Sequence, residues 1–185
     1  MNNFLERSKI LQENSSQLDQ SVKEISKLYI DSIKNGGKLI FAGNGGSAAE
    51  AQHMSAEFVG TLVKSNFRRA FKSISLTTDT SFLTAWSNDF GFKDIFKRQL
   101  EGLAEYNDCF IAYSTSGNSE NIISALEYTK SVSITSVLFS GEDKSKCSEL
   151  ADYTFHAPSK NTALIQEIHT MVGHEVCSII DNSKL

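Results

Sequence analysis

Five short runs rich in Ile, Leu, Phe and Val recur along this 185-residue chain, and stretches with helical spacing separate them. The runs are Lys38–Ala42, Phe71–Leu76, Cys109–Tyr113, Ile134–Phe139 and Tyr153–Ala157. Strands that alternate with helices are typical of a parallel sheet flanked by helices. The sequence therefore predicts an α/β protein whose strands all run in one direction.

Residues before the first run follow a helical pattern. Apolar residues recur at helical spacing from Leu11 to Ile33, which predicts a long amphipathic N-terminal helix. Gly36-Gly37 should end that helix. No linker, repeat or low-complexity segment follows, so we expect one domain, with an N-terminal helical segment over residues 1–36 and an α/β core over residues 37–185.

Composition narrows the class of protein. The apolar fraction of 40% and the charged fraction of 22% are ordinary for a soluble globular protein. Neither a signal peptide nor a membrane-spanning run is evident, so we expect a cytoplasmic protein with no membrane partner. Cys109, Cys147 and Cys177 are odd in number and scattered, which favours buried reduced thiols. A net charge of -4 argues against nucleic-acid binding, and we interpret the basic stretch Lys64–Arg69 as a solvated surface.

A glycine-rich turn, Gly43-Asn-Gly-Gly-Ser-Ala48, follows the first predicted strand and opens a helix. Its backbone amides and the positive end of the helix dipole suit an anion. The turn also satisfies the G-x-G-x-x-A pattern of dinucleotide-binding domains. Such domains usually place an acidic residue at the end of the second strand, but here Ile74–Thr78 has none and Asp79 comes just past it. A tight turn that binds nothing is the alternative interpretation.

A hydroxyl-rich turn, Ser114-Thr-Ser-Gly-Asn-Ser119, ends another predicted strand and precedes a helix that begins near Glu120. Four hydroxyls and several amides at a helix N-terminus can bind a phosphate without a cationic side chain. Ser119 taken alone could be only an N-cap. Open α/β sheets bind ligands at the carboxyl ends of their strands, so the two turns together favour a small phosphorylated ligand.

Two predicted helices carry polar side chains that could do chemistry. His53 and Glu57 lie at i and i+4, and therefore on one helix face, although such a pair is more often a surface interaction. Gln166 and His174 lie two turns apart on the last helix, whose apolar face could pack on the sheet or on another subunit. Imidazole, carboxylate and amide oxygen are ligands that suit zinc. His156 has no acidic neighbour, and we interpret it as structural or exposed.

Considered together, these motifs resemble the phosphoheptose isomerases of the sugar isomerase (SIS) domain superfamily. The matching segments, in the expected order, are Gly43–Glu57, Ser87–Gly91, Ser114–Ser119 and Ile165–His174. The resemblance implies a three-layer α/β/α sandwich with a five-stranded parallel sheet, flavodoxin-like or Rossmann-like, and a long N-terminal helix. It also implies an aldose–ketose isomerase that converts sedoheptulose 7-phosphate into D-glycero-D-manno-heptose 7-phosphate. That reaction is the first step towards the ADP- or GDP-heptose used for bacterial lipopolysaccharide core or capsule.

The resemblance further assigns roles to residues of this chain. Glu57 and His174 become the acid/base pair. One zinc ion per subunit is expected on His53, Glu57, Gln166 and His174. Substrate contacts fall on Asn44, Gly45, Gly46, Glu57, Asn88, Asp89, Ser114, Thr115, Ser116, Ser119 and Gln166. A homotetramer with active sites shared between subunits is implied as well, and the first and last helices offer apolar surface for it.

Two other functions within the same superfamily remain as alternatives. A noncatalytic SIS protein that associates with the bacterial replication initiator keeps both turns, but lacks the acid matching Glu57 and the histidine matching His174. Isomerases and regulators that act on hexose or arabinose phosphates are a second alternative, which the four proposed zinc ligands argue against. The enzyme is favoured because Glu57 and His174 are both present.

Overall fold

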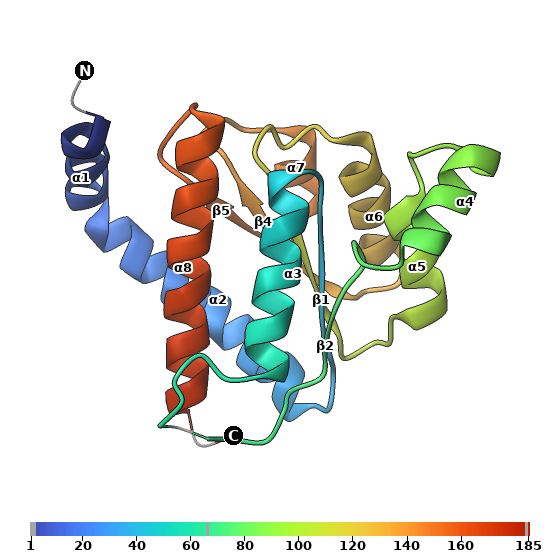
Figure 1. Cartoon of the computed structure of the whole chain (residues 1–185), viewed down its shortest axis with the longest axis horizontal. Helices are drawn as coiled ribbons and strands as arrows, with labels where there is room; N and C mark the ends of the chain where they lie inside the picture. Colours follow the sequence, from blue (N-terminus) through green and yellow to red (C-terminus); the bar gives the residue numbers. More distant parts are fainter. Residues whose placement is uncertain (1–2, 66, 184) are drawn as a thin grey trace.

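A computed structural model describes residues 3–65, 67–183 and 185. The first two residues of the expected N-terminal segment and Asn66 of the basic stretch lie outside the described residues. The strands of the described part form one parallel sheet in the order β2-β1-β3-β4-β5 (Figure 1). They are β1 (Leu39–Gly43), β2 (Ser73–Ser75), β3 (Cys109–Ser114), β4 (Thr135–Ser140) and β5 (Tyr153–His156). The five predicted strands are confirmed, with ends that differ by one or two residues.

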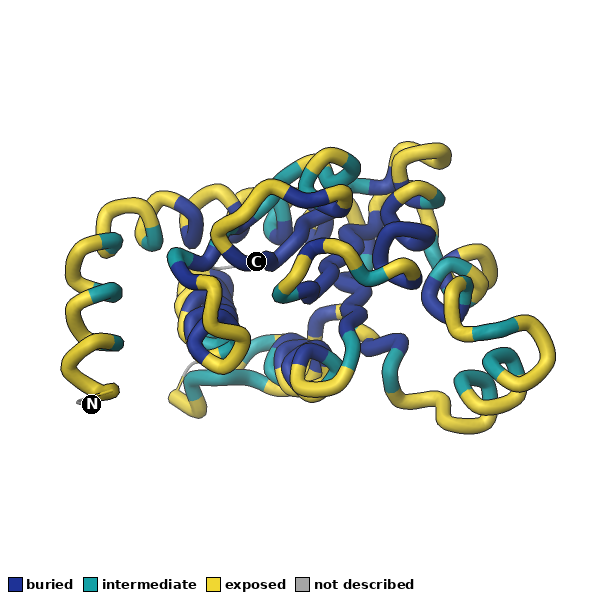
Figure 2. Tube along the Cα trace, turned by 90° about the horizontal axis from the view of Figure 1, so that it is seen from above, coloured by how far each residue is buried: buried dark blue, intermediate teal, exposed yellow. Residues whose placement is uncertain are grey.

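Alternate residues of the strands face two helical layers. Leu39 and Phe41 of β1 pack with one layer, whereas Ile40 and Ala42 pack with the other. The first layer holds α2 (Ser15–Lys34), α3 (Gly46–Val59) and α8 (Thr162–Asn182). The second holds α4 (Thr80–Phe90), α5 (Ile95–Leu103), α6 (Glu120–Ser131) and α7 (Lys146–Leu150). The predicted three-layer α/β/α sandwich is confirmed, with the buried residues concentrated between the layers (Figure 2).

The N-terminal helix differs from the prediction because it is interrupted. Instead of one long helix, α1 (Asn3–Glu13) and α2 meet at Asn14. Nδ2 of Asn14 donates to the carbonyl of Ile10 at 2.8 Å, and the backbone N–H of Asn14 donates to the same carbonyl at 3.2 Å. Helix α1 buries no residue and extends away from the body of the molecule (Figures 1 and 2). After α2 the chain turns at Gly36, where φ is 79°, as the glycine pair predicts.

Strands β1 and β3 lie side by side at the centre of the sheet, with Gly43 in register with Tyr113. The chain order reverses between these two strands, because β2 lies outside β1 and β4 lies outside β3. Such a switch point is where open α/β sheets hold their ligands. Both predicted binding turns follow these two strands and therefore lie at this point.

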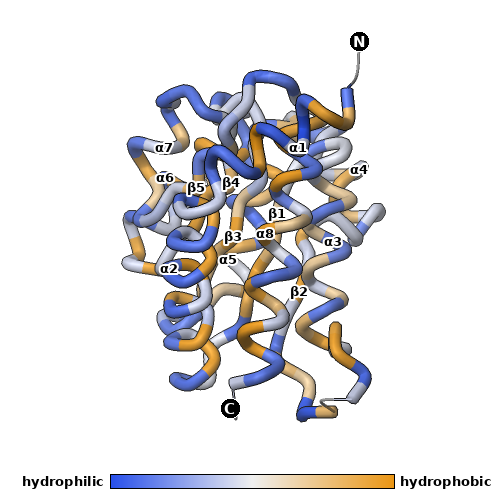
Figure 3. The backbone as a smooth tube through the Cα atoms, turned by 90° about the vertical axis from the view of Figure 1, so that its left-hand side faces the viewer, coloured by the Kyte–Doolittle hydropathy of each residue, from blue (hydrophilic) through white to orange (hydrophobic). Residues whose placement is uncertain are grey.

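Hydrophobic residues recur along the strands and α8 (Figure 3). These residues are buried because the sheet packs against helices on both faces. Among the helices of the described residues, none combines the length and apolar character needed to cross a membrane.

Candidate functional site

Helices α3 and α8 pack side by side on one face of the sheet (Figure 1). The helices approach each other closely at Gly173, where an added Cβ would lie 2.5 Å from Sδ of Met54. Gly173 directly precedes His174, and Met54 directly follows His53. The small residue at position 173 therefore brings the two predicted histidines together.

His53, Glu57 and His174 form a compact group. Nε2 of His53 lies 2.7 Å from Nε2 of His174, and Nδ1 of His53 lies 3.9 Å from Oε1 of Glu57. One ligand atom from each of the three residues lies within 4.8 Å of the others. The side chain of His53 is 43% exposed and that of Glu57 is 20% exposed, so the group can be reached from solvent. Three of the four residues predicted to bind metal thus gather in one place.

The donor set of this group fits a zinc ion. Two imidazole nitrogens face each other, and at this separation at least one of them must present a lone pair. Neutral imidazole and carboxylate are common zinc ligands. Gln166, the fourth predicted ligand, lies two turns earlier on α8, and its amide contacts the glycine turn: a Cβ at Gly46 would lie 2.6 Å from Nε2. No hydrogen bond among the described residues joins that amide to the histidine pair.

Glu50 is a buried carboxyl near this group that sequence reasoning did not single out. It is 9% exposed, and its Oε2 accepts a hydrogen bond of 2.6 Å from Oγ1 of Thr170 on α8. Burial raises the pKa of Glu50, and the hydrogen bond from Thr170 offsets only part of that effect. Its place one helical turn before His53 is the sequence signal that could have found it.

The glycine turn has a shape that needs its glycines. A Cβ at Gly43 would overlap the carbonyl of Ser47, and Gly45 adopts a φ of 57°. Asn44 lies between them and exchanges two hydrogen bonds with Asn121 of α6, at 2.9 and 2.8 Å. Gly46 is exposed, as is Gly45. The turn is therefore both open to solvent and tied to the neighbouring strand–helix connection.

No side chain of the hydroxyl-rich turn caps the N-terminus of α6. Ser119 occupies the N-cap position of α6 but makes no capping bond, and its Oγ lies 3.2 Å from Oγ of Ser114. Thr115 and Ser116 line a polar hollow of about 320 Å³. The rest of that hollow is formed by the segments that follow β4 and β5 and by the first turns of α8. Two of the four predicted phosphate-binding hydroxyls, those of Thr115 and Ser116, thus line this hollow, whereas Ser114 is buried.

Comparison with known proteins agrees with this arrangement. The SIS domain family model matches residues 4–139. A phosphoheptose isomerase from Aliarcobacter butzleri is 41% identical over 179 residues, which cover 97% of this chain and 94% of that protein. Phosphoheptose isomerase 2 of Campylobacter jejuni is 46% identical over 160 residues, or 86% of this chain and 79% of that protein. The chain belongs to the phosphoheptose isomerase family.

Solved structures agree with that membership. The structure of a phosphoheptose isomerase from Francisella tularensis superimposes with a TM-score of 0.92 at 30% identity. The match covers 98% of this chain and 95% of that one. The fold of this family member is therefore that of the SIS phosphoheptose isomerases over nearly its whole length.

Two predicted substrate contacts of this phosphoheptose isomerase family member lie apart from the histidine pair. Asn88 and Asp89 are exposed on α4, in the helical layer opposite α3 and α8, and Nδ2 of Asn88 donates to Oδ1 of Asp89 at 2.8 Å. The structure does not bring them to His53 within one chain. Asp79, the acidic residue weighed for a dinucleotide, accepts from the backbone N–H of Phe82 at 2.9 Å and caps α4. Asp79 is thus placed as the N-cap of α4.

Our interpretation of Lys64–Arg69 as a solvated surface is wrong at Arg68. Its side chain is 10% exposed, and Nε lies 2.6 Å from Oδ1 of Asp181 near the end of α8. The same guanidinium donates to the carbonyl of Glu57 at 3.1 Å. Arg68 is buried because it pairs with Asp181, which lies more than a hundred residues later in the chain. The charge pattern around Arg68 does not indicate such a distant partner.

The remaining histidines and the cysteines have structural roles. Nδ1 of His156 lies 2.8 Å from the carbonyl of Gly141, as expected for a structural residue. His169 is 1% exposed, and burial lowers its pKa to about 4. The three cysteines are buried and free, which confirms the prediction of reduced thiols.

Proposed function

We propose that this chain isomerises sedoheptulose 7-phosphate to D-glycero-D-manno-heptose 7-phosphate. The observation that carries the proposal is the His53–Glu57–His174 group, gathered on adjacent helices in a member of the phosphoheptose isomerase family. The position of the two turns at the switch point of the sheet supports an anion site there. The product would supply heptose for the lipopolysaccharide core or capsule of a bacterium, and the enzyme would act in the cytoplasm.

The reaction needs one base at carbon and one acid at oxygen. In the proposed mechanism Glu57 removes a proton from C1 of the ketose while His174 donates a proton to O2, which gives a cis-enediol. His174 then takes the proton from O1, and Glu57 returns the carbon-bound proton to C2. No proton is gained or lost overall, and each positioned transfer is worth about 10²–10⁴-fold in rate.

We assign one zinc ion per subunit to His53, Glu57, Gln166 and His174. The gathered imidazoles and carboxylate support this assignment, as does the ligand preference of zinc. Bound there, zinc would polarise the carbonyl and stabilise negative charge on the enediolate oxygens. His53 and Glu57 on α3 and His174 on α8 would hold the reacting carbons between them. Both helices are packed on the same face of the sheet, which fixes the positions of these side chains.

The substrate would be held by groups that do not react. Ser114, Thr115, Ser116 and Ser119 are proposed to bind the phosphate, and Asn44, Gly45, Gly46, Asn88, Asp89 and Gln166 to contact the sugar chain. Binding energy from a distant phosphate can fix C1 and C2 beside the base, which raises the rate of the chemical step. The uncapped N-terminus of α6 supports the phosphate assignment.

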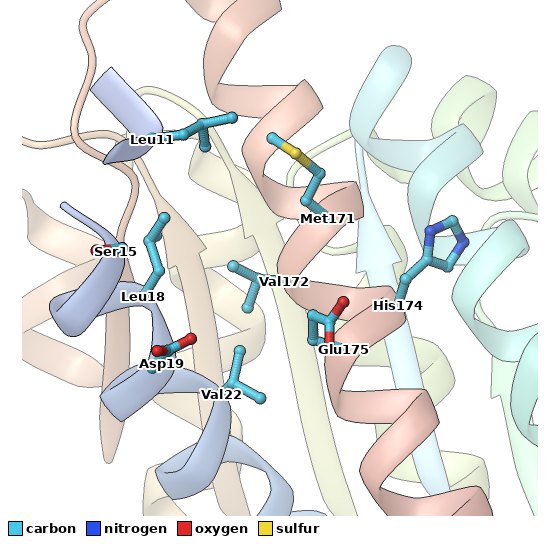
Figure 4. A pocket seen from close by; sticks show the side chains of 9 residues that line it. All are labelled: Leu11, Ser15, Leu18, Asp19, Val22, Met171, Val172, His174 and Glu175. Carbon is cyan, nitrogen blue, oxygen red and sulfur yellow. The ribbon is translucent and has the colours of Figure 1, made fainter. Parts of the chain in front are cut away.

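We also propose that the enzyme is a homotetramer whose active sites are shared between subunits, with residues 1–36 used in packing. Two features support this. Helix α1 has no fully buried residue within its own chain, and Leu18 and Val22 of α2 face Val172 of α8 across a hollow of about 390 Å³ (Figure 4). His174 also lines that hollow, and its Nε2 lies 2.7 Å from Nε2 of His53 on α3 (Figure 4). A second copy could deliver Asn88 and Asp89 to a site that their own chain does not reach.

Purified protein supplied with zinc and sedoheptulose 7-phosphate should form the aldoheptose 7-phosphate. Glu57→Gln and His174→Ala should each lower kcat by about 10²–10⁴-fold. Glu101→Gln, an exposed carboxylate change on α5, is the matched control and should keep wild-type kcat. Absence of turnover by the wild type would refute the enzyme and favour the noncatalytic alternative, whereas full activity of Glu57→Gln would remove Glu57 from the chemistry.

A further inference from the structure

One pair of amide side chains joins the glycine turn to the hydroxyl-rich turn. Nδ2 of Asn44 donates to Oδ1 of Asn121 at 2.9 Å, and Nδ2 of Asn121 donates back to Oδ1 of Asn44 at 2.8 Å. Asn121 is 2% exposed, in the first turn of α6, whereas Asn44 is half-buried. The side chain of Asn121 is not among the predicted site residues.

The reciprocal pairing determines how Asn44 presents its amide. A primary amide carries two N–H donors and one oxygen with two lone pairs, so the pair leaves Asn44 one N–H and one lone pair for a ligand. Turning either amide over alone would set oxygen against oxygen and nitrogen against nitrogen. The neighbours of Asn44 in the chain are Gly43 and Gly45, which have no side chains to restrain it. Its orientation therefore depends on Asn121.

We propose that Asn121 is a positioning residue for sugar-phosphate binding, which acts by fixing the amide of Asn44 and the spacing of the two turns. The inference rests on the proposed function, because Asn44 is assigned there to the sugar chain. Asn44 does not transfer protons in the proposed mechanism, so we expect its contact with the sugar to be equally strong in the ground state and the transition state. Loss of such a contact raises KM and leaves kcat unchanged. Loss of the pairing should accordingly appear in KM.

Asn121→Asp is the test because it keeps the shape and removes one donor. The carboxylate can still accept from Asn44 but has no hydrogen for Oδ1, so two oxygens face each other. At pH 8 we expect KM for sedoheptulose 7-phosphate to rise roughly tenfold, with kcat within about twofold. A protonated carboxyl again offers one donor and one acceptor. The ratio of variant to wild-type KM should therefore shrink towards one as the pH falls from 8 to 5.5.

Controls separate this effect from charge and from misfolding. Asn107→Asp makes the same change at an exposed position before β3 and should keep a KM ratio near one at every pH. Asn121→Ser, which adds no charge and is too short to reach Asn44, should raise KM at every pH without the pH trend, and it serves if Asn121→Asp does not fold. Wild-type KM in both Asn121 variants, or a pH-independent rise in Asn121→Asp, would overturn the inference.

Calorimetric binding of sedoheptulose 7-phosphate distinguishes failure of the inference from failure of the proposed function. A wild type that binds the sugar phosphate without converting it would refute the isomerase, and the same variants would then be compared by Kd with the same expected changes. A wild type that neither binds nor converts it would overturn both. An active wild type whose Asn121 variants bind equally well would overturn the inference alone.

Discussion

Arg68 and Asp181 form an ion pair that closes the loop after α3 onto the end of α8, with 2.6 Å between Nε and Oδ1. The carboxylate of Asp181 also accepts from the backbone N–H of Leu62 and of Val63, at 2.9 and 3.1 Å. Burial raises the pKa of Asp181, but the hydrogen bonds from Arg68, Val63 and Thr61 outweigh it, so the pKa lies below its ordinary value. The pair therefore joins the two helices that carry the candidate site.

Removing one partner of this pair should destabilise the protein strongly. Arg68→Ala leaves a carboxylate that is 1% exposed without its cation, and breaking a buried pair in this way costs about 3–5 kcal/mol. Urea unfolding at a fixed protein concentration measures the loss. Arg69→Ala, at the exposed neighbouring position, should change the free energy of unfolding by less than about 0.5 kcal/mol. Equal effects of the two changes would contradict a structural role for Arg68.

A second prediction concerns the close approach of α3 and α8. Alanine in place of a helical glycine usually stabilises by up to about 1 kcal/mol, but at Gly173 the new Cβ meets Met54, and overpacking costs about 1–3 kcal/mol. We expect Gly173→Ala to lower the free energy of unfolding. In a Met54→Ala background the same change should become neutral or favourable, which a double-mutant cycle detects.

Gly102→Ala in α5 is the control for that cycle, because nothing lies within 4 Å of its added Cβ. It should be neutral or stabilising in both backgrounds. Additive effects of Gly173→Ala and Met54→Ala would show that the contact does not set the spacing of the two helices.

The sheet and its two polar turns could be predicted because their signals are local. Each strand is a short apolar run, and the glycine turn and the hydroxyl-rich turn directly follow β1 and β3. The i,i+4 spacing of His53 and Glu57 is local too. These features need only helix and strand geometry, which a sequence expresses within a few residues.

Features that depend on distant partners could not be predicted in this way. Arg68 has the local appearance of a solvated cation, and only Asp181 on another helix makes it buried. Asn121 follows the hydroxyl-rich turn with no pattern of its own, because its role comes from pairing with Asn44 across the switch point. The break at Asn14 could not be predicted because the apolar residues on both sides of it keep helical spacing.

His169 should make the protein sensitive to mild acid. Nε2 lies 3.1 Å from the carbonyl of Ser140, which can only accept, and burial lowers the pKa of the ring from 6.5 to about 4. Below pH 6.5 His169 is therefore protonated in the unfolded chain but stays neutral in the folded chain until the pH approaches 4. Stability should fall as the pH drops from 7 to 5, by about 2 kcal/mol from this residue, with no such loss between pH 8 and 7.

Urea unfolding at these pH values, with protein concentration held constant, checks the effect of His169. His169→Gln keeps an N–H donor and does not titrate, so its stability should depend less steeply on pH than that of the wild type. Parallel curves for the two proteins between pH 7 and pH 5 would show that another group carries the acid sensitivity.

Metal content should follow the histidine pair. His53→Ala removes one imidazole of a group whose ligand atoms lie within 4.8 Å of one another, so the zinc bound per subunit should fall well below one. Elemental analysis after dialysis measures it. His156→Ala removes a histidine that bonds the Gly141 carbonyl instead and should retain wild-type zinc. Unchanged zinc in His53→Ala would argue against the assigned site.

The proposed tetramer makes a prediction about apolar residues that a single chain leaves in contact with water. Phe4 of α1 is 84% exposed, and Met171 of α8, 39% exposed, lines the hollow between the N-terminal helices and α8 (Figure 4). A carboxylate placed in a contact between copies would have to lose its hydration without a partner. Phe4→Glu and Met171→Glu should therefore shift the particle from about four times the 20.4 kDa chain mass towards smaller species in light scattering.

Tyr106→Glu is the matched control, since Tyr106 is 75% exposed before the amino end of β3, away from α1 and α8. It should leave the mass unchanged. If Asn88 and Asp89 act on the site of another subunit, the dissociated variants should also lose turnover while keeping the far-ultraviolet circular dichroism of a folded chain. Fully active smaller species would refute active sites shared between subunits, because such sites cannot form without the second copy.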